Sequence, residues 1–175
     1  MELISAEQRK TLTRGAREVL KVELRDHYEV DAELLVAWRA GETEKLAASY
    51  ESWRGVIEAE TAKGWTFRRV RVVSEPLSDY QRMAVEWSGS AVDAGEELRW
   101  LPRRLVSAVA LPGNDCFVID GQGVIFNVLD ADGSYCLEIQ YSTDPDVVRY
   151  CRDAFAAAWA LATPHHAFRA QMISA

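Results

Sequence analysis

The sequence predicts an α/β or α+β fold in which helices cover a single mixed β-sheet. Two observations support this prediction. Up to Gly64 the apolar residues mostly follow a helical period, and from Trp65 they alternate with polar residues as in a strand. After residue 115, short apolar segments are separated by glycine-containing turns, which is typical of a meander of strands. Helices packed on a sheet bury both patterns in one core.

The first 63 residues contain four predicted elements. These are a helix over residues 5–17, a half-buried strand over 20–25, a helix over 32–39 and a longer helix over 43–63. Lys21 and Glu23 alternate with apolar neighbours in the strand, and Asp31 is the expected N-cap of the helix that Gly41 ends. We expect residues 1–63 to pack as a strand-and-helix segment on an α/β core formed by residues 64–175.

The core is predicted to supply most of the sheet. Its expected strands cover residues 65–73, 97–101, 116–120, 124–129 and 135–141. Ser74 and Pro76 suit the N-cap and first turn of a helix that follows the first of these strands. Asp144 and Pro145 suit the start of a last helix, which Pro164 is expected to end.

Composition and charge exclude several classes of protein. The 175 residues are 49% hydrophobic and carry a net charge of −7, so we expect no direct binding of nucleic acid. The longest apolar run, over residues 154–162, is far shorter than the ~20 residues that span a membrane. The first twenty residues are charged and lack an apolar leader, so the sequence predicts a cytoplasmic protein.

Motifs for catalysis or metal binding are not found in the sequence. Cys116, Cys136 and Cys151 lack the spacing of zinc ligands, and the adjacent His165 and His166 point to different sides. No P-loop, dinucleotide fingerprint or nucleophile elbow is present. We therefore predict no catalytic residues, no metal site and no cofactor.

Arginines and a helix start suggest a site for an anion or a partner. Arg69 and Arg71 share one face of a predicted strand, and the free N–H groups of the following helix favour an anion. The predicted binding residues are Arg69, Arg71, Ser74, Glu75, Asp79, Tyr80, Arg99, Arg103, Asn114 and Asp115. Alternatively, the arginines pair internally with Glu75, Glu96 and Glu97, and the polar residues only cap the helix.

Several segments have distinctive sequences, among them residues 69–80 (RVRVVSEPLSDY), 94–104 (AGEELRWLPRR) and 111–115 (LPGND). These segments resemble an actinobacterial, Streptomyces-type family of unknown function whose members are encoded beside XRE-type helix-turn-helix regulators. The C-terminal half is also faintly similar to phospholipase-D-like sensor domains. Active members of that class carry a His-x-Lys pair, whereas this chain has Asn114, Asp115 and Cys116 before Asp120. The resemblance therefore implies that phosphodiesterase chemistry has been lost.

Two functions follow as hypotheses. The first is a non-catalytic regulatory protein that acts with a helix-turn-helix regulator, with a small anionic ligand as a further expectation. The second is an enzyme whose site is built from Ser74, Glu75, Tyr80, Arg99 and Asp115, which would have to meet in one cleft. The sequence leaves open whether the protein forms a homodimer.

Overall fold

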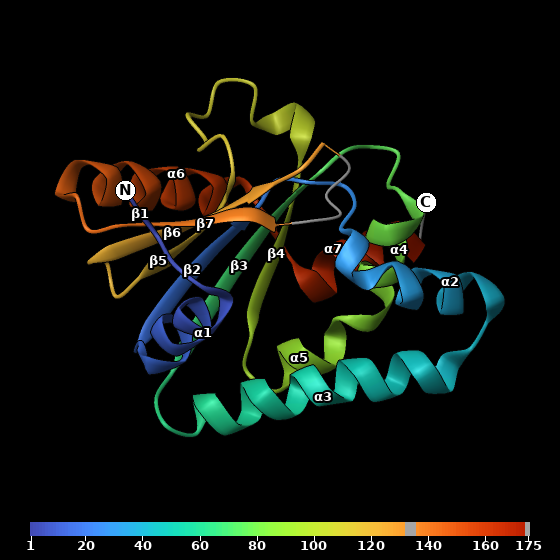
Figure 1. Ribbon diagram of the computed structural model, residues 1–175. Helices are drawn as coiled ribbons and strands as arrows, with labels where there is room; N and C mark the ends of the chain where they lie inside the picture. Colours follow the sequence, from blue (N-terminus) through green and yellow to red (C-terminus); the bar gives the residue numbers. More distant parts are fainter. Residues whose placement is uncertain (132–135, 174–175) are drawn as a thin grey trace.

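The fold is one mixed sheet with helices on both faces (Figure 1), as the computed structural model of residues 1–131 and 136–173 shows. The strands are β1 (Glu2–Leu3), β2 (Glu18–Glu23), β3 (Thr66–Val73), β4 (Glu97–Pro102), β5 (Asp115–Ile119), β6 (Gly123–Leu129), β7 (Cys136–Ser142) and β8 (Thr163–Pro164). Their order in the sheet is β1-β7-β6-β5-β2-β3-β4-β8. Strands β2, β3 and β4 run parallel and the other pairs antiparallel, which confirms the predicted single mixed sheet.

The helices divide between the two faces of this sheet. They are α1 (Ala6–Gly15), α2 (Ala32–Ala40), α3 (Thr43–Thr61), α4 (Asp79–Trp87), α5 (Gly89–Asp93), α6 (Pro145–Leu161) and α7 (His165–Ile173), with short turns η1 (Glu29–Asp31) and η2 (Arg103–Leu105). Helix α6 packs on one face, where Val22, Val70 and Val72 join Phe155 in the largest apolar cluster. The other helices lie toward the opposite face or beside it (Figure 1).

Strand β2 lies in the middle of the sheet, between β3 and β5. It is buried on both faces, whereas the sequence predicted a half-buried strand. The alternation is real, because Val22 faces α6 while Lys21 and Glu23 point to the other side. Helices α1, α2 and α3 stand over that other side (Figure 1), so its charged residues are covered instead of facing open solvent.

The predicted helix start at Ser74 is wrong. Helix α4 begins at Asp79, and its cap is Ser78, whose hydroxyl accepts a hydrogen bond from the backbone N–H of Gln81 at 3.1 Å. Ser74 is held elsewhere, since its N–H and its hydroxyl donate to the carboxylate of Asp26 at 2.7 and 2.6 Å. Both serines suit an N-cap by sequence, and the contact with a distant carboxylate decides between them.

Pro164 does not follow the last helix as a simple stop. It belongs to β8, which pairs with β4, and a further helix, α7, begins at His165. The sequence also gave no prediction for the short elements β1 and α5. Residues 132–135 lie outside the described residues. They include the start of the predicted strand 135–141 and part of the turn predicted before it.

Candidate functional site

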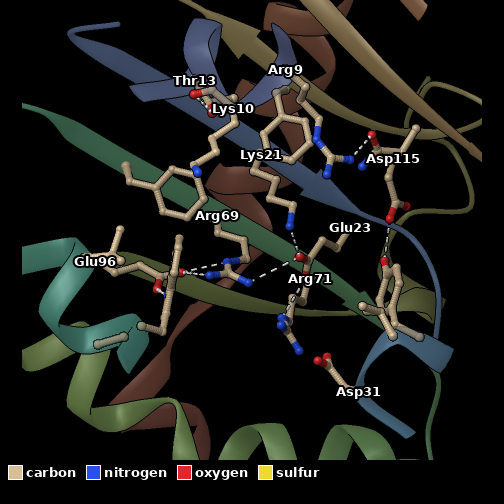
Figure 2. Close-up of a pocket in the computed structure, with 18 of the residues that line it drawn as sticks. Arg9, Lys10, Thr13, Lys21, Glu23, Asp31, Arg69, Arg71, Glu96 and Asp115 are labelled. Atoms are coloured by element: carbon tan, nitrogen blue, oxygen red, sulfur yellow. Dashed lines mark hydrogen bonds and ion pairs between the residues drawn. The ribbon is translucent and has the colours of Figure 1, made fainter. Parts of the chain in front are cut away.

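A cavity of about 800 Å³ lies between the sheet and the helices on the face opposite α6 (Figure 2). Its floor is formed by the central strands β2, β3 and β5, and its walls by α1, α2, α3 and α5. A space of this size falls in the range that small-molecule sites occupy. Its floor carries the charged residues Lys21, Glu23, Arg69 and Arg71 beside Phe67 and Phe117, and such a cluster of charges is unusual for the middle of a sheet.

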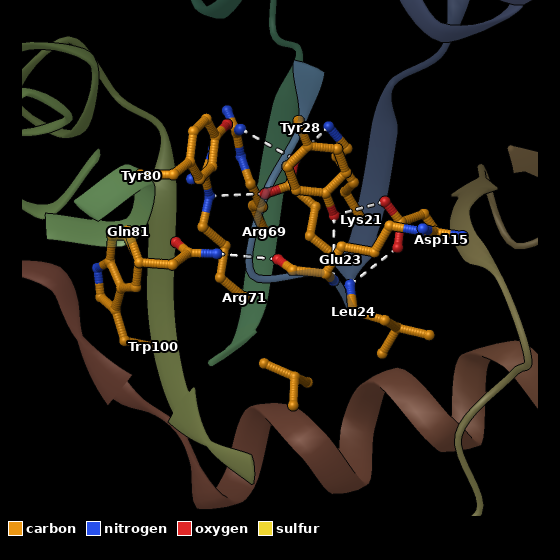
Figure 3. A network of polar contacts seen from close by, with 12 residues as sticks. Lys21, Glu23, Leu24, Tyr28, Arg69, Arg71, Tyr80, Gln81, Trp100 and Asp115 are labelled. Atoms are coloured by element: carbon orange, nitrogen blue, oxygen red, sulfur yellow. Dashed lines mark hydrogen bonds and ion pairs between the residues drawn. The ribbon is translucent and has the colours of Figure 1, made fainter. Parts of the chain in front are cut away.

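The register of β2 and β3 brings the floor charges together (Figure 3). Lys21 lies opposite Arg69, and Glu23 opposite Arg71, in parallel neighbouring strands. Glu23 pairs with Lys21, and its two carboxylate oxygens contact Arg69 Nη1 at 3.3 Å and Arg71 Nε at 2.6 Å. Glu96 completes the group by accepting from Arg69 Nε at 2.6 Å. Three cations thus surround two carboxylates.

Burial and these neighbours set the protonation of the floor. Burial raises the pKa of Glu23, but Arg71, Lys21 and Arg69 lower it by more, so the carboxylate stays ionised. Burial lowers the pKa of Lys21, and Glu23 opposes that effect. Within this group of five residues, Lys21, Arg69 and Arg71 are set against Glu23 and Glu96, an excess of one positive charge, and the carboxylate of Asp115 lies nearby on β5.

The guanidinium of Arg71 is incompletely satisfied. The residue is only 8% exposed, and its Nη1 is buried without a hydrogen-bond partner among the described residues. The guanidinium carbon, Cζ, lies over the ring of Trp100, 5.5 Å from the centroid. Figure 2 shows the guanidinium extending from the floor into the cavity, toward Asp31. A buried donor without a partner costs about 1–3 kcal/mol, so an acceptor bound here would remove a real penalty.

Three tyrosines line the same cavity. The hydroxyl of Tyr28 donates to Asp115 at 2.6 Å, and that of Tyr80 donates to Asp31 at 2.8 Å. Burial raises the pKa of Tyr50 to about 12, and it also raises the pKa values of Tyr28 and Tyr80. All three hydroxyls are therefore protonated at neutral pH and act as donors, not as nucleophiles.

Four of the predicted binding residues line this cavity, namely Arg69, Arg71, Tyr80 and Asp115. The carboxylate of Asp115 accepts from the backbone N–H of Leu24 at 2.8 Å as well as from Tyr28. Burial raises the pKa of Asp115, while its hydrogen bond with Tyr28 lowers it. Asp115 thus ties β5 to the end of β2 at one side of the cavity.

The other predicted residues lie outside it. Arg99 points to the α6 face, where it stacks over Trp159 at 4.2 Å and donates to its carbonyl. Arg103 donates to the Ser74 hydroxyl at 3.0 Å and to the Leu24 carbonyl at 2.6 Å, at the end of the sheet.

Three acidic or amide residues complete the set outside the cavity. Glu75 pairs with Arg104 and Asp79 with Arg39 at the surface. Asn114 borders a separate hollow beside α6. The hypothetical catalytic set is therefore divided: Tyr80 and Asp115 share the cavity, and its other three members lie elsewhere.

Sequence reasoning missed several residues of the cavity, chiefly Lys21, Glu23, Asp31 and Tyr50. The available signal was the spacing of Lys21 and Glu23, two charged residues that are two positions apart in a strand and therefore point to the same face. The spacing of Arg69 and Arg71 repeats that signal on β3. Two such strands side by side indicate a charged sheet face, but the sequence did not show that the strands are neighbours.

Solved structures that are similar to this chain at low identity include TrmBL2, an archaeal chromatin protein described as showing a novel mode of DNA binding. The TM-score is 0.48 and the identity 18%, over 89% of this chain and 48% of that one, so the present chain spans about half the length of its neighbour. A search of curated proteins finds no match.

This comparison contradicts the prediction that the protein does not bind nucleic acid directly, because the neighbour is described as binding DNA. The prediction rested on the net charge of −7, which describes the whole molecule. Nucleic acid is bound by a local basic surface, and a net charge does not exclude one.

Within the described part of the chain, no helix is long and apolar enough to cross a membrane. The family model for a domain of unknown function, DUF6879, matches residues 6–170. This match covers nearly the whole chain and bears out the resemblance to a family of unknown function. The chain therefore belongs to the DUF6879 family.

Proposed function

We propose that the protein is a cytoplasmic, non-catalytic regulatory protein that binds a small anion in the cavity on the sheet. The resemblance of its sequence to proteins encoded beside XRE-type regulators suggests that it acts with a helix-turn-helix regulator. The observation that carries the proposal is the buried Nη1 of Arg71, which lacks a hydrogen-bond partner among the described residues. A carboxylate or phosphate oxygen would supply the missing acceptor.

The surroundings of Arg71 support an anion more than a neutral ligand. The charged residues that line the cavity are Arg9, Lys10, Arg14, Lys21, Arg69 and Arg71 against Glu7, Glu23, Asp31, Glu96 and Asp115, which leaves an excess of one positive charge. Charge-assisted hydrogen bonds are roughly twice as strong as those between neutral groups.

A role without catalysis fits the state of the polar groups. The tyrosine hydroxyls remain protonated at neutral pH, and Asp115 already accepts two hydrogen bonds. The residues of the alternative catalytic set do not meet in one cleft. This division supports binding over turnover.

Thermal melts and calorimetry with a panel of carboxylates and phosphates test the proposal. The informative variant is Arg71→Lys, which keeps the charge and loses the planar fork. Its matched control is Arg68→Lys, three residues earlier in β3. The side chain of Arg68 points to the other face and pairs with Glu18 and Glu97 near solvent.

At least one anion should raise the melting temperature of the wild type, since a ligand at 100 times its Kd stabilises by about 2.7 kcal/mol. Arg71→Lys should weaken that binding at least tenfold, and Arg68→Lys should bind as the wild type does. Unchanged binding by Arg71→Lys, together with a lowered melting temperature, would show that Arg71 is only a structural ion pair. Failure of every carboxylate and phosphate to bind would also overturn the proposal.

A further inference from the structure

A carboxylate also points into the cavity, opposite the arginine. Asp31 occupies the N-cap position of α2, where an aspartate usually accepts a hydrogen bond from a backbone N–H of the first turn. Here the side chain makes no cap bond, and it accepts instead from the Tyr80 hydroxyl at 2.8 Å. Asp31 is thus turned away from its own helix and lines the cavity (Figure 2).

Asp31 and Arg71 face the same space without forming an ion pair, so their charged atoms lie more than 4.0 Å apart. Both line the cavity together with Tyr50 and Tyr80, and Arg71 lowers while Asp31 raises the pKa values of these two tyrosines. The Tyr80 hydroxyl fixes the position of Asp31, and Glu23 fixes that of Arg71. Two held charges of opposite sign therefore border one unfilled space.

We infer that the anion of the proposed function is a zwitterion, an α-amino acid whose carboxylate binds Arg71 and whose ammonium binds Asp31. This inference rests on the proposed function and narrows its ligand class. A simple anion would satisfy Arg71 but would be repelled by Asp31, whereas a zwitterion meets both charges at once. An α-amino acid carries its two charged groups on one carbon atom, which suits two protein charges bordering one small space.

The tyrosines complete the subsite. The hydroxyl of Tyr50 has no hydrogen-bond partner in residues 1–131 and 136–173, and it lines the cavity close to Arg71. It can donate to the same carboxylate that Arg71 binds. The aromatic faces of Tyr28 and Tyr80, whose centroids lie 5.7 Å apart, also favour an ammonium group beside Asp31.

The remaining volume indicates a large apolar side chain on the ligand. Beyond Arg69 the cavity is lined by Trp53, Trp65 and Phe67, and the rings of Trp65 and Phe67 stack at 5.0 Å. The guanidinium of Arg69 lies over the rings of Trp53 and Phe67, so this aromatic surface lies directly beside a cation. A cavity of about 800 Å³ is much larger than the ammonium and carboxylate groups alone require.

Calorimetry on the full chain tests the inference with three L-amino acids, phenylalanine, tryptophan and leucine. Each amino acid is compared with two analogues, one that lacks the amino group and one that lacks the carboxylate. Glycine, which has both charged groups and no side chain, measures how much the side chain contributes to binding. The variant is Asp31→Asn, which can still accept from Tyr80 and should fold. The control is Glu33→Gln, an exposed residue in the first turn of the same helix that pairs with Lys45.

At least one of the three amino acids should bind at least tenfold more tightly than either of its analogues and than glycine. In Asp31→Asn, the amino acid should no longer bind more tightly than its analogue without the amino group. In Glu33→Gln, this difference in affinity should remain. If the analogues without the amino group bind as tightly as the amino acids, or if only phosphates bind, the inference of a zwitterionic ligand is wrong while the proposed anion site stands. If no carboxylate or phosphate binds at all, both proposals fail.

Discussion

Replacing Glu23 by glutamine would remove the negative charge at the centre of the cavity floor while keeping the shape of the side chain. Glu23 is 4% exposed and contacts three cations, Lys21, Arg69 and Arg71. In Glu23→Gln, Glu96 would remain as the only carboxylate of the floor group, and it touches Arg69 alone within that group. Two buried cations would then have lost their counter-ion.

The expected cost follows from this loss of compensation. Breaking a buried ion pair from one side costs about 3–5 kcal/mol, because the remaining charge stays desolvated. For a chain of this length the melting temperature changes by roughly 2–4 °C per kcal/mol, so it should fall by about 6–20 °C. Removing one cation together with the carboxylate, in Lys21→Met combined with Glu23→Gln, should recover part of this loss.

The dependence on pH has a defined sign. The cations hold the pKa of Glu23 below its usual range, so its stabilising effect is present above the unfolded pKa of about 4.3. That effect is lost as the pH falls from there toward the folded pKa. The difference between the wild type and Glu23→Gln should therefore be constant near neutral pH and should narrow below about pH 4.

Urea unfolding followed by tryptophan fluorescence measures these differences, with melts over a series of pH values. Glu18→Gln is the control, because Glu18 lies on the same strand and pairs with Arg68 near solvent, where a pair contributes about 0–1 kcal/mol. A loss below about 1 kcal/mol in Glu23→Gln would refute the reasoning. Such a result would mean that water or an ion already screens the floor.

Three further predictions concern residues around the core. Burial lowers the pKa of His165 to about 4, so stability should fall by up to about 3 kcal/mol between pH 6.5 and 4, and His165→Gln should weaken that dependence in urea titrations. Tyr28→Phe removes a donor from Asp115 and should cost about 1–3 kcal/mol by the same assay, whereas a negligible loss in Tyr28→Phe beside a large loss in Tyr28→Leu would show that only the packing of the ring matters. Arg99→Lys loses the stack over Trp159 and should lower stability by about 1 kcal/mol without changing anion affinity in calorimetry.

The sequence predicted the architecture well because each strand carries its own periodicity. The single mixed sheet and the helices over its faces follow from that local signal. It predicted the helix start at Ser74 wrongly, since the deciding contact comes from Asp26, far away in the chain. The edge strand β8 shows the same limit, because only its pairing with β4 makes residues 163–164 a strand.

The candidate site was only partly predictable. Arg69 and Arg71 were chosen for their spacing in one strand, and both reach the cavity. Lys21 and Glu23 carry the same signal, but their importance depends on β2 lying beside β3, which only the folded topology reveals. Arg99 was grouped with them by charge alone, although the sheet sends its side chain to the other face.

The short strands at the two margins of the sheet affect how the protein meets copies of itself. Strands β1 and β8 each pair with their neighbour through two residues, and Pro164 in β8 has no N–H to offer. A foreign strand that extended the sheet beyond β8 would find too few backbone groups to form a ladder. The sheet is therefore poorly suited to fibril-like growth at that margin, even though its centre is rich in buried valine.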